Sequence, residues 1–207
     1  MKRLLGFCFA VTFTLVLSGT ALAQSIVGSA HDFSSAAWNT SDQICIVCHT
    51  THNADVSVSD APLWNHEMTS ATFTPYSSAS MNATVGQPDA SSKLCMSCHD
   101  GTIAVDNYGG QTGGSHFITG NSLVGTDLSD DHPVSFTYDA ALANSDGGLY
   151  DPTTANSGMG GTISNDMLIG GKVQCASCHD VHNSQGFSKL LIISNSSSAL
   201  CLTCHNK

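Results

Sequence analysis

Positive charge is the scarcest feature of this sequence. Its 207 residues include six lysines and arginines against sixteen aspartates and glutamates, and the formal net charge at pH 7 is -10. Proteins that bind nucleic acids neutralise phosphates with lysine and arginine, so this composition argues against a nucleic acid as partner. An acidic surface instead favours a basic protein partner.

Long apolar segments are also missing, except at the amino terminus. Lys2 and Arg3 precede an apolar stretch at residues 4–17, and an Ala-Leu-Ala site follows at residues 21–23. This order is typical of a secretory signal peptide, which we predict at residues 1–23. The stretch is shorter than the roughly 20 apolar residues of a membrane span, and no later segment approaches that length. We therefore expect an exported protein without a membrane span, located at the cell surface, outside the cell or in the periplasm.

Long runs of strong helix formers are few as well. Glycine, serine, threonine, asparagine and aspartate dominate the stretches between the cysteines, and aromatic residues make up 7% of the chain. A mature chain of this composition has little aliphatic material from which to build a large core. Something other than the polypeptide is therefore expected to fill its interior.

Cysteine, by contrast, is abundant. Cys8 lies in the predicted signal peptide, and the other eight cysteines form four pairs, each with two residues between its members and a histidine directly after it. This Cys-x-x-Cys-His pattern is the attachment motif of c-type haem. Two thiols at this spacing reach the two vinyl groups of one porphyrin, while the histidine binds the iron. We predict four covalently bound haems c, held by Cys45, Cys48 and His49; Cys95, Cys98 and His99; Cys175, Cys178 and His179; and Cys201, Cys204 and His205.

Other uses of paired cysteines fit less well. Four disulfides are the ordinary arrangement in an exported protein, and Cys-x-x-Cys pairs also build zinc sites. Neither explains a histidine after every pair, and an oxidising compartment disfavours the free thiolates of a zinc site. A thioredoxin-like redox role needs only one such pair, on a strand–helix unit.

Each haem iron has a sixth coordination position, and its occupant separates electron carriers from catalysts. Six further histidines are available for four such positions, whereas no methionine stands in an obvious ligand context. We therefore predict low-spin iron with two histidine ligands. The candidate distal ligands are His31, His52, His132 and His182, with His66 as the main competitor and His116 last.

An internal repeat helps to assign these candidates. The first and third motifs both continue as His-x-x-His-Asn, at residues 49–53 and 179–183, and the second and fourth are both preceded by Ser-Ser-x-Leu. We predict one cytochrome domain, residues 24–207, built from two-haem units at about residues 24–110 and 125–207.

The spacing within the repeat directs the assignment. A histidine one helical turn beyond a haem-binding histidine is badly placed to bind the same iron from the other side. His52 is therefore assigned to the haem of the second motif and His182 to that of the fourth. His31 and His132, which precede the first motif of their unit, are assigned to the haems of the first and third motifs.

The predicted fold class is a multihaem cytochrome c that is mostly irregular, with short helices at the motifs, few short strands, and haems as its core. The longest cysteine-free stretch, residues 100–174, is rich in paired glycines and is expected to form loops. Within it, short strands are predicted at residues 102–105 and 134–138. Loss of haem is expected to unfold the chain.

The motifs resemble a known family. Together with residues 61–66 (APLWNH), 94–102 (LCMSCHDGT) and 173–183 (VQCASCHDVHN), they are similar to the doubled-motif multihaem cytochromes of metal-respiring bacteria, in particular to outer-surface tetrahaem cytochromes. The resemblance implies bis-histidine haems and export to the cell surface. It also implies polymerisation into conducting filaments, in which one axial histidine is donated to the adjacent subunit, and His31 is then the candidate donor.

Electron transfer is therefore the predicted function, along a filament or as a discrete carrier between redox partner proteins. The enzyme alternative is a multihaem reductase of a small oxyanion, which needs an iron with an open position. The surplus of histidines and the uniform attachment motifs argue against it, so no catalytic residue is predicted.

Overall fold

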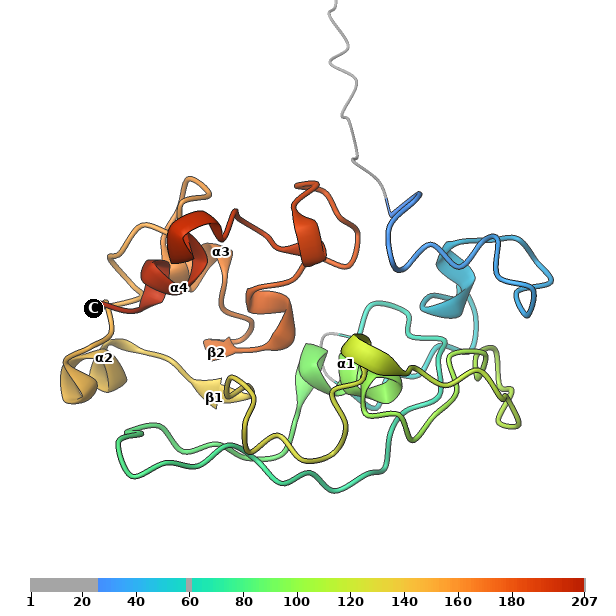
Figure 1. Ribbon diagram of the computed structural model, residues 1–207, viewed down its shortest axis with the longest axis horizontal. Helices are drawn as coiled ribbons and strands as arrows, with labels where there is room; N and C mark the ends of the chain where they lie inside the picture. Colours follow the sequence, from blue (N-terminus) through green and yellow to red (C-terminus); the bar gives the residue numbers. More distant parts are fainter. Residues whose placement is uncertain (1–25, 59–60, 207) are drawn as a thin grey trace, which may run out of the picture.

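The computed structural model describes residues 26–58 and 61–206, so the predicted signal peptide lies outside it. Within this part of the chain, no helix combines the length and apolar character that crossing a membrane requires. Irregular backbone dominates, and the helices are short (Figure 1). With η for a 3-10 helix, the elements are η1 (Cys45–Val47), α1 (Ala90–His99), η2 (Gly120–Ser122), β1 (Phe136–Thr137), α2 (Ala140–Asp146), α3 (Ile163–Asp166), β2 (Lys172–Val173), η3 (Cys175–Ser177), η4 (Ser188–Leu190), η5 (Ser196–Ser198) and α4 (Ala199–Cys204).

The predicted fold class is confirmed in its main features, since each attachment motif lies on a short helix. The first and third motifs begin with the 3-10 helices η1 and η3, whereas the second and fourth lie on the α-helices α1 and α4. The type of helix thus alternates with the predicted repeat. Four side chains of the helix α1 are buried: Ser92, Leu94, Met96 and Ser97.

The strands agree with the prediction only in part. Of the two strands in the described structure, Phe136–Thr137 lies within the predicted segment 134–138, whereas Lys172–Val173 was not predicted. Phe136 pairs with Val173, and Thr137 with Lys172, in one short antiparallel β1–β2 sheet. The strand predicted at residues 102–105 is wrong, because this segment forms bends and a turn. Its apolar residues Ile103, Ala104 and Val105 are buried, so the run reflects burial rather than extended pairing.

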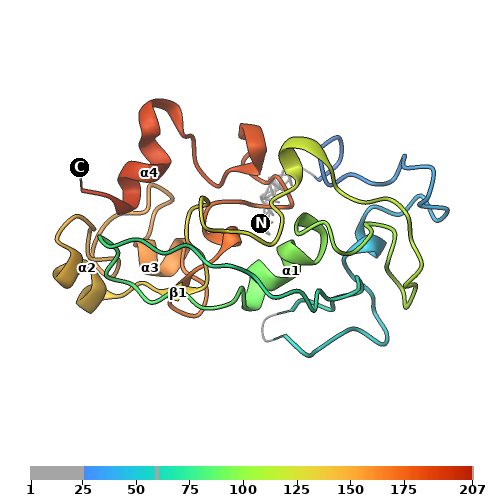
Figure 2. The same cartoon turned by 60° about the horizontal axis from the view of Figure 1, so that its bottom comes forward.

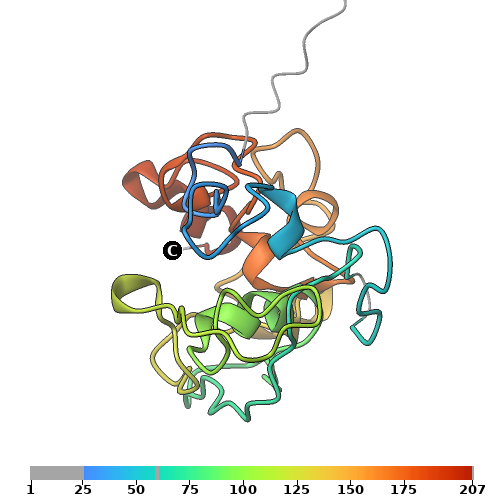
Figure 3. The same ribbon diagram turned by 90° about the vertical axis from the view of Figure 1, so that its right-hand side faces the viewer.

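The two halves of the chain occupy opposite ends of an elongated molecule (Figures 1 and 2). Viewed along the long axis, η3 of the second half lies close to α1 of the first (Figure 3), and these two elements are in contact. A loop of the first half also reaches into the second half, where the Asn82 side-chain amide donates to a carboxylate oxygen of Asp146 at 3.3 Å. Ala83 and Val85 of this loop pack against the core of the second half.

The apolar core consists of two separate clusters. The smaller one joins Phe73, Met96 and Leu128. The larger one lies in the second half and contains Phe136, Tyr138, Ala143, Ile163, Met167, Val173 and Ile192. Several large apolar side chains remain exposed, including Leu63, Leu123, Val124, Val181, Phe187 and Leu202. The polypeptide alone therefore buries only part of its apolar surface.

Replacing Tyr138 with phenylalanine is expected to lower the free energy of unfolding by about 1–2 kcal/mol. The Tyr138 ring is buried, and its hydroxyl donates to the Tyr150 backbone carbonyl at 2.6 Å. In the phenylalanine variant this carbonyl would lose its hydrogen-bond donor. Denaturant unfolding of the haem-loaded protein measures the difference. The matched control is Tyr150→Phe, which keeps that carbonyl and removes a hydroxyl from a half-exposed ring; equal losses in both variants would contradict the prediction.

Candidate functional site

The first and third motifs share one local structure. In each, the backbone N–H of the motif histidine donates to the backbone carbonyl of the first cysteine, at 2.8 Å for His49 and 3.1 Å for His179. The chain then turns back at Asn53 and Asn183, whose φ angles are 57° and 54°, values that asparagine tolerates better than most residues. The returning segments pair with the motif histidine through antiparallel bridges, His49 with Trp64 and His179 with Leu191.

This geometry fixes the rings of the motif histidines. The Nδ1 atom of His49 lies 2.6 Å from the Pro62 carbonyl, and that of His179 lies 2.9 Å from the Lys189 carbonyl. The second motif does the same from another loop, with His99 Nδ1 at 2.7 Å from the Ser122 carbonyl. A carbonyl only accepts, so each Nδ1 carries the proton and each Nε2 keeps its lone pair for a metal.

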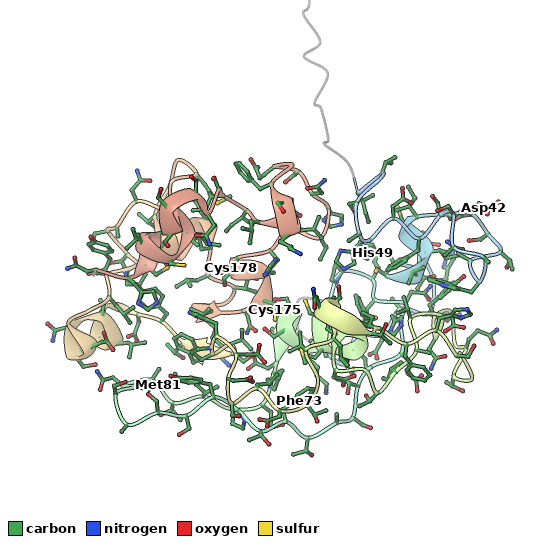
Figure 4. The ribbon with its side chains drawn as sticks, viewed as in Figure 1. Asp42, His49, Phe73, Met81, Cys175 and Cys178 are labelled. Atoms are coloured by element: carbon green, nitrogen blue, oxygen red, sulfur yellow. The ribbon has the colours of Figure 1, made fainter. Side chains whose placement is uncertain are left out.

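Three motif histidines face a second histidine ring. The ring centres are 6.1 Å apart for His49 and His182, 6.1 Å for His99 and His31, and 6.3 Å for His205 and His132. The His49 and His182 rings are nearly parallel, with 12° between their planes. Figure 4 shows His49, Cys175 and Cys178 near the middle of the molecule, where the two halves meet.

These separations fit an iron between two imidazoles. A metal–imidazole bond is about 2.0 Å long and the ring centre lies about 1.1 Å beyond the nitrogen, so rings on opposite sides of one iron have centres about 6 Å apart. Ring packing alone allows any separation from about 4.5 to 7 Å. The agreement of three pairs, each with one histidine of an attachment motif, favours an axial ligand arrangement.

The pairs differ from those expected from the repeat. His182 faces His49 rather than the fourth motif, and His31 faces His99 rather than the first. His132 faces His205, not the third motif. Two of these pairs stay within one half but involve the other motif of that half, because His31 lies against His99 and His132 against His205. The third pair joins the halves, which pack against each other, and the turn at Asn183 presents His182 to the first half.

His31 shows a buried atom that the polypeptide leaves unsatisfied. Its Nδ1 is buried without a hydrogen-bond partner in the described structure. Burial, together with the nearby His99, lowers the pKa of His31 to about 4, so the ring is neutral at physiological pH. A neutral imidazole is the form that binds metal, and a buried nitrogen without a partner is costly. The residue therefore fits the ligand role predicted for it.

The remaining candidates occupy different surroundings. His52 is exposed and lines a surface groove of about 520 Å³ together with His66. His66 itself is buried, with Nδ1 at 2.9 Å from the Glu67 carbonyl, Nε2 at 3.1 Å from the Ala104 carbonyl and the Cys98 sulfur at 3.4 Å from Nε2. Both of its nitrogens thus contact backbone carbonyls of the polypeptide.

His116, the last candidate, is hydrogen-bonded to Asp106, Nδ1 to Oδ2 at 2.9 Å. Partial burial of Asp106 opposes its ionisation, but hydrogen bonds from His116 and from the Ser115 backbone prevail and lower the pKa of Asp106 to about 2. The ring of His116 also packs 6.0 Å from that of Trp38. These contacts describe a histidine that anchors the loop between Asp106 and His116.

The lowered pKa of Asp106 predicts that the stability of the folded chain depends on pH. Because the pKa of Asp106 is lower in the folded chain than its ordinary value of 3.8, its stabilising effect is full above that value and is lost as the pH falls toward about 2. Asp106→Asn is therefore expected to lower the midpoint of thermal unfolding at pH 7, with a difference that shrinks between pH 4 and pH 2. Calorimetry across this range measures it, and a difference independent of pH would contradict it.

Cysteines of successive attachment motifs lie near each other in the structure. Burial, with Cys48 nearby, raises the pKa of Cys98 to about 12, and Cys95 and Cys175 lie close enough to shift each other's pKa. Burial, with Cys175 and Cys201 nearby, raises the pKa of Cys178 to about 11. All eight cysteines are free thiols. Each pair is thus available for thioether bonds, and each motif neighbours the next.

The arrangement agrees with a comparison against known families. Residues 169–207 match the family model of the doubled CXXCH motif. This match covers the third and fourth motifs, indicates a multihaem c-type cytochrome and implies covalently bound haem c. A search of curated proteins found no match. The first two motifs carry the same pattern outside the matched segment.

Sequence reasoning missed the residues that hold the site in place. The carbonyls that orient the motif histidines belong to Pro62, Ser122 and Lys189, and every residue has a carbonyl, so the sequence gives no signal for them. The buried side chains of Ser92 and Gln174, next to the second and third motifs, were likewise not predicted to have a role. Ser92 belongs to the repeated Ser-Ser-x-Leu segment, which was the available hint.

Proposed function

We propose that the chain carries four covalently bound haems c, each with two axial histidines, and that it transfers electrons outside the cytoplasm. The observation that supports this most strongly is the set of three pairs of histidine rings, each pair with centres about 6 Å apart and each including one attachment-motif histidine. When bound, haem iron alternates between ferric and ferrous states and so takes up and releases one electron. The polypeptide holds the thioether sulfurs and orients the imidazoles.

The fourth pair of axial histidines is assigned by analogy between the two repeats. His182, three residues after the third motif histidine, faces the first motif histidine. Since residues 49–53 and 179–183 share the same sequence pattern and the same turn, we assign His52 in the same way to the haem of His179. This assignment uses every predicted distal ligand once and leaves His66 and His116 with structural roles.

The paired rings favour a carrier over an enzyme. A reductase needs one iron with a position open to substrate, and a second imidazole closes that position. The acidic composition favours basic redox partners, because opposite charges steer the two proteins together.

The finer proposal is an outer-surface cytochrome that polymerises, similar to the tetrahaem cytochrome OmcE. His31 is then not the axial donor to the adjacent subunit that the resemblance implied, because its ring lies against His99 of the same chain. The resemblance of the motifs supports polymerisation, and so does the elongated shape, in which η1 and α4 lie toward opposite ends (Figure 1). Copies joined end to end would continue the line of attachment sites. Electron microscopy of the protein secreted by its own host tests this: filaments are expected, and dispersed monomers would favour the discrete carrier.

An intact mass and visible spectra of the mature protein, from a host that attaches c-type haem, test the electron-carrier proposal itself. A mass increase equal to four haems and fully low-spin oxidised and reduced spectra are expected. Fewer haems would contradict the count, and a high-spin component would favour the reductase.

A further inference from the structure

A buried polar network joins the two halves of the molecule at Gln174. This residue directly precedes Cys175 and is only 1% exposed. It lies between η3, which begins the third motif, and α1, which carries the second. The network therefore connects two attachment sites that belong to different halves.

Every polar atom of the Gln174 side chain has a partner. Its Oε1 accepts from the Ser92 hydroxyl at 2.5 Å and from the Ser135 hydroxyl at 2.9 Å. Its Nε2 donates to the Asp89 carboxylate at 2.7 Å. The partners lie 82, 39 and 85 residues away along the chain, so the contacts depend on the assembled fold.

The partners are themselves connected to the attachment segments. Ser92, which is fully buried on α1, accepts from the backbone N–H of Cys175 at 2.9 Å. Asp89 directly precedes α1, and its backbone N–H donates to the Ser135 hydroxyl at 3.0 Å. Asp89 also forms an ion pair with Lys172, but both side chains are partly exposed, so this pair contributes little.

Such a network defines geometry more than it adds stability. Buried hydrogen bonds contribute modestly to the free energy of unfolding, whereas a buried polar group without its partner is costly, so the network permits one arrangement and penalises displaced ones. Cys95 of α1 and Cys175 of η3 lie close enough for each thiol to shift the pKa of the other. The relative position of the second and third attachment sites is therefore fixed here.

We propose that Gln174 is a positioning residue for electron transfer between the two halves, acting through Ser92, Ser135 and Asp89 to hold the second and third attachment sites at their working separation. This inference rests on the proposed electron-transfer function. In the step concerned, one electron leaves the haem of one site, which is oxidised, and reduces the haem of the other. Gln174 itself takes no part in the redox chemistry.

The test replaces Gln174 with methionine, which keeps the length of the side chain and removes its three hydrogen bonds. The halves stay joined in this variant, because the loop with Ala83 and Val85 still packs on the core of the second half. The matched control is Gln87→Met. Gln87 also forms two side-chain hydrogen bonds, to the N–H and carbonyl of Phe73, but both lie within the first half.

Both variants are made as haem-loaded protein and reduced by a pulse of substoichiometric reductant. Gln174→Met is expected to keep the haem content, the low-spin spectrum and the rate of initial reduction. Its internal redistribution of electrons should slow by about tenfold, since transfer between held groups is sensitive to shifts of an ångström. The paramagnetic resonance spectrum of the oxidised protein should also change, because the magnetic interaction between neighbouring irons depends on their separation. Gln87→Met should match the unchanged protein in both measurements.

Redistribution at the unchanged rate in Gln174→Met would overturn the inference while leaving the proposed function intact. A wild-type protein with fewer haems, or without internal redistribution, would instead refute the proposed function. If Gln174→Met does not accumulate, Ser92→Ala removes one contact of the same network on a helix that accepts alanine well. A smaller slowing is expected in that variant, and an unchanged rate there would also overturn the inference.

Discussion

Produced without haem attachment, the mature chain is expected to lose its cooperative thermal unfolding transition entirely. The two apolar clusters are separate, and the smaller one rests on Phe73, Met96 and Leu128. Large apolar side chains next to the motifs, such as Leu63, Val181 and Leu202, stay exposed in the polypeptide alone. A ligand that binds only the folded state stabilises that state, and covalently held haem does so without dissociating.

The measurement compares the same mature chain from hosts with and without the haem attachment machinery. Calorimetry should show a sharp transition for the haem-loaded form and none for the haem-free form, which should also bind a hydrophobic dye more strongly. The cysteines should be kept reduced in the haem-free sample, so that incorrect disulfides do not cause the difference. A sharp transition in the haem-free chain would mean that the two apolar clusters are sufficient for cooperative folding, and it would contradict the prediction.

Replacing His182 with alanine is expected to convert one haem of the protein to high spin, and that haem should be the one held by Cys45 and Cys48. The rings of His182 and His49 are nearly parallel and their centres lie 6.1 Å apart, which is the separation that the proposed coordination of one iron between them requires. Removal of one axial imidazole leaves a five-coordinate or water-bound iron, which is high spin. Visible and paramagnetic resonance spectra report the change, and added imidazole should restore the low-spin form.

Two controls separate this pairing from the one expected from the repeat. His116→Ala removes a histidine that is held by Asp106 and should leave every haem low spin. In a protein that already lacks Cys45 and Cys48, the further change His182→Ala should produce no high-spin haem, because the affected site is gone. A high-spin signal in that combined variant would place His182 at another haem.

The attachment sites could be predicted from the sequence because haem attachment depends on covalent chemistry at fixed spacing. The short helices at the motifs followed from the same local pattern and are confirmed, including the helical turn at Cys175. Local patterns failed where burial imitates a strand: Ile103 and Val105 are apolar because they are covered, and Gly101, with a φ angle of 75°, introduces a bend.

The pairing of histidines was beyond the sequence for a different reason. His31 and His182 meet their partners across long stretches of chain. The contact of His182 depends on how the two halves pack, and that of His31 on how the first half folds back on itself. The role of Gln174 escaped notice likewise, since a glutamine beside a motif becomes informative only once Ser92 and Asp89 are found around it. Contacts between distant segments decide both features.

The meeting of His49 with His182 also constrains the order in which the protein can be assembled. The first attachment motif is synthesised early, but the ring that lies against its histidine is encoded 133 residues later. In the proposed haem protein, the first site would therefore lack its second imidazole until nearly the whole chain had been made. A chain cut short before the third motif would then hold a haem with one open coordination position, so the carboxyl-terminal half would be needed to complete the first site.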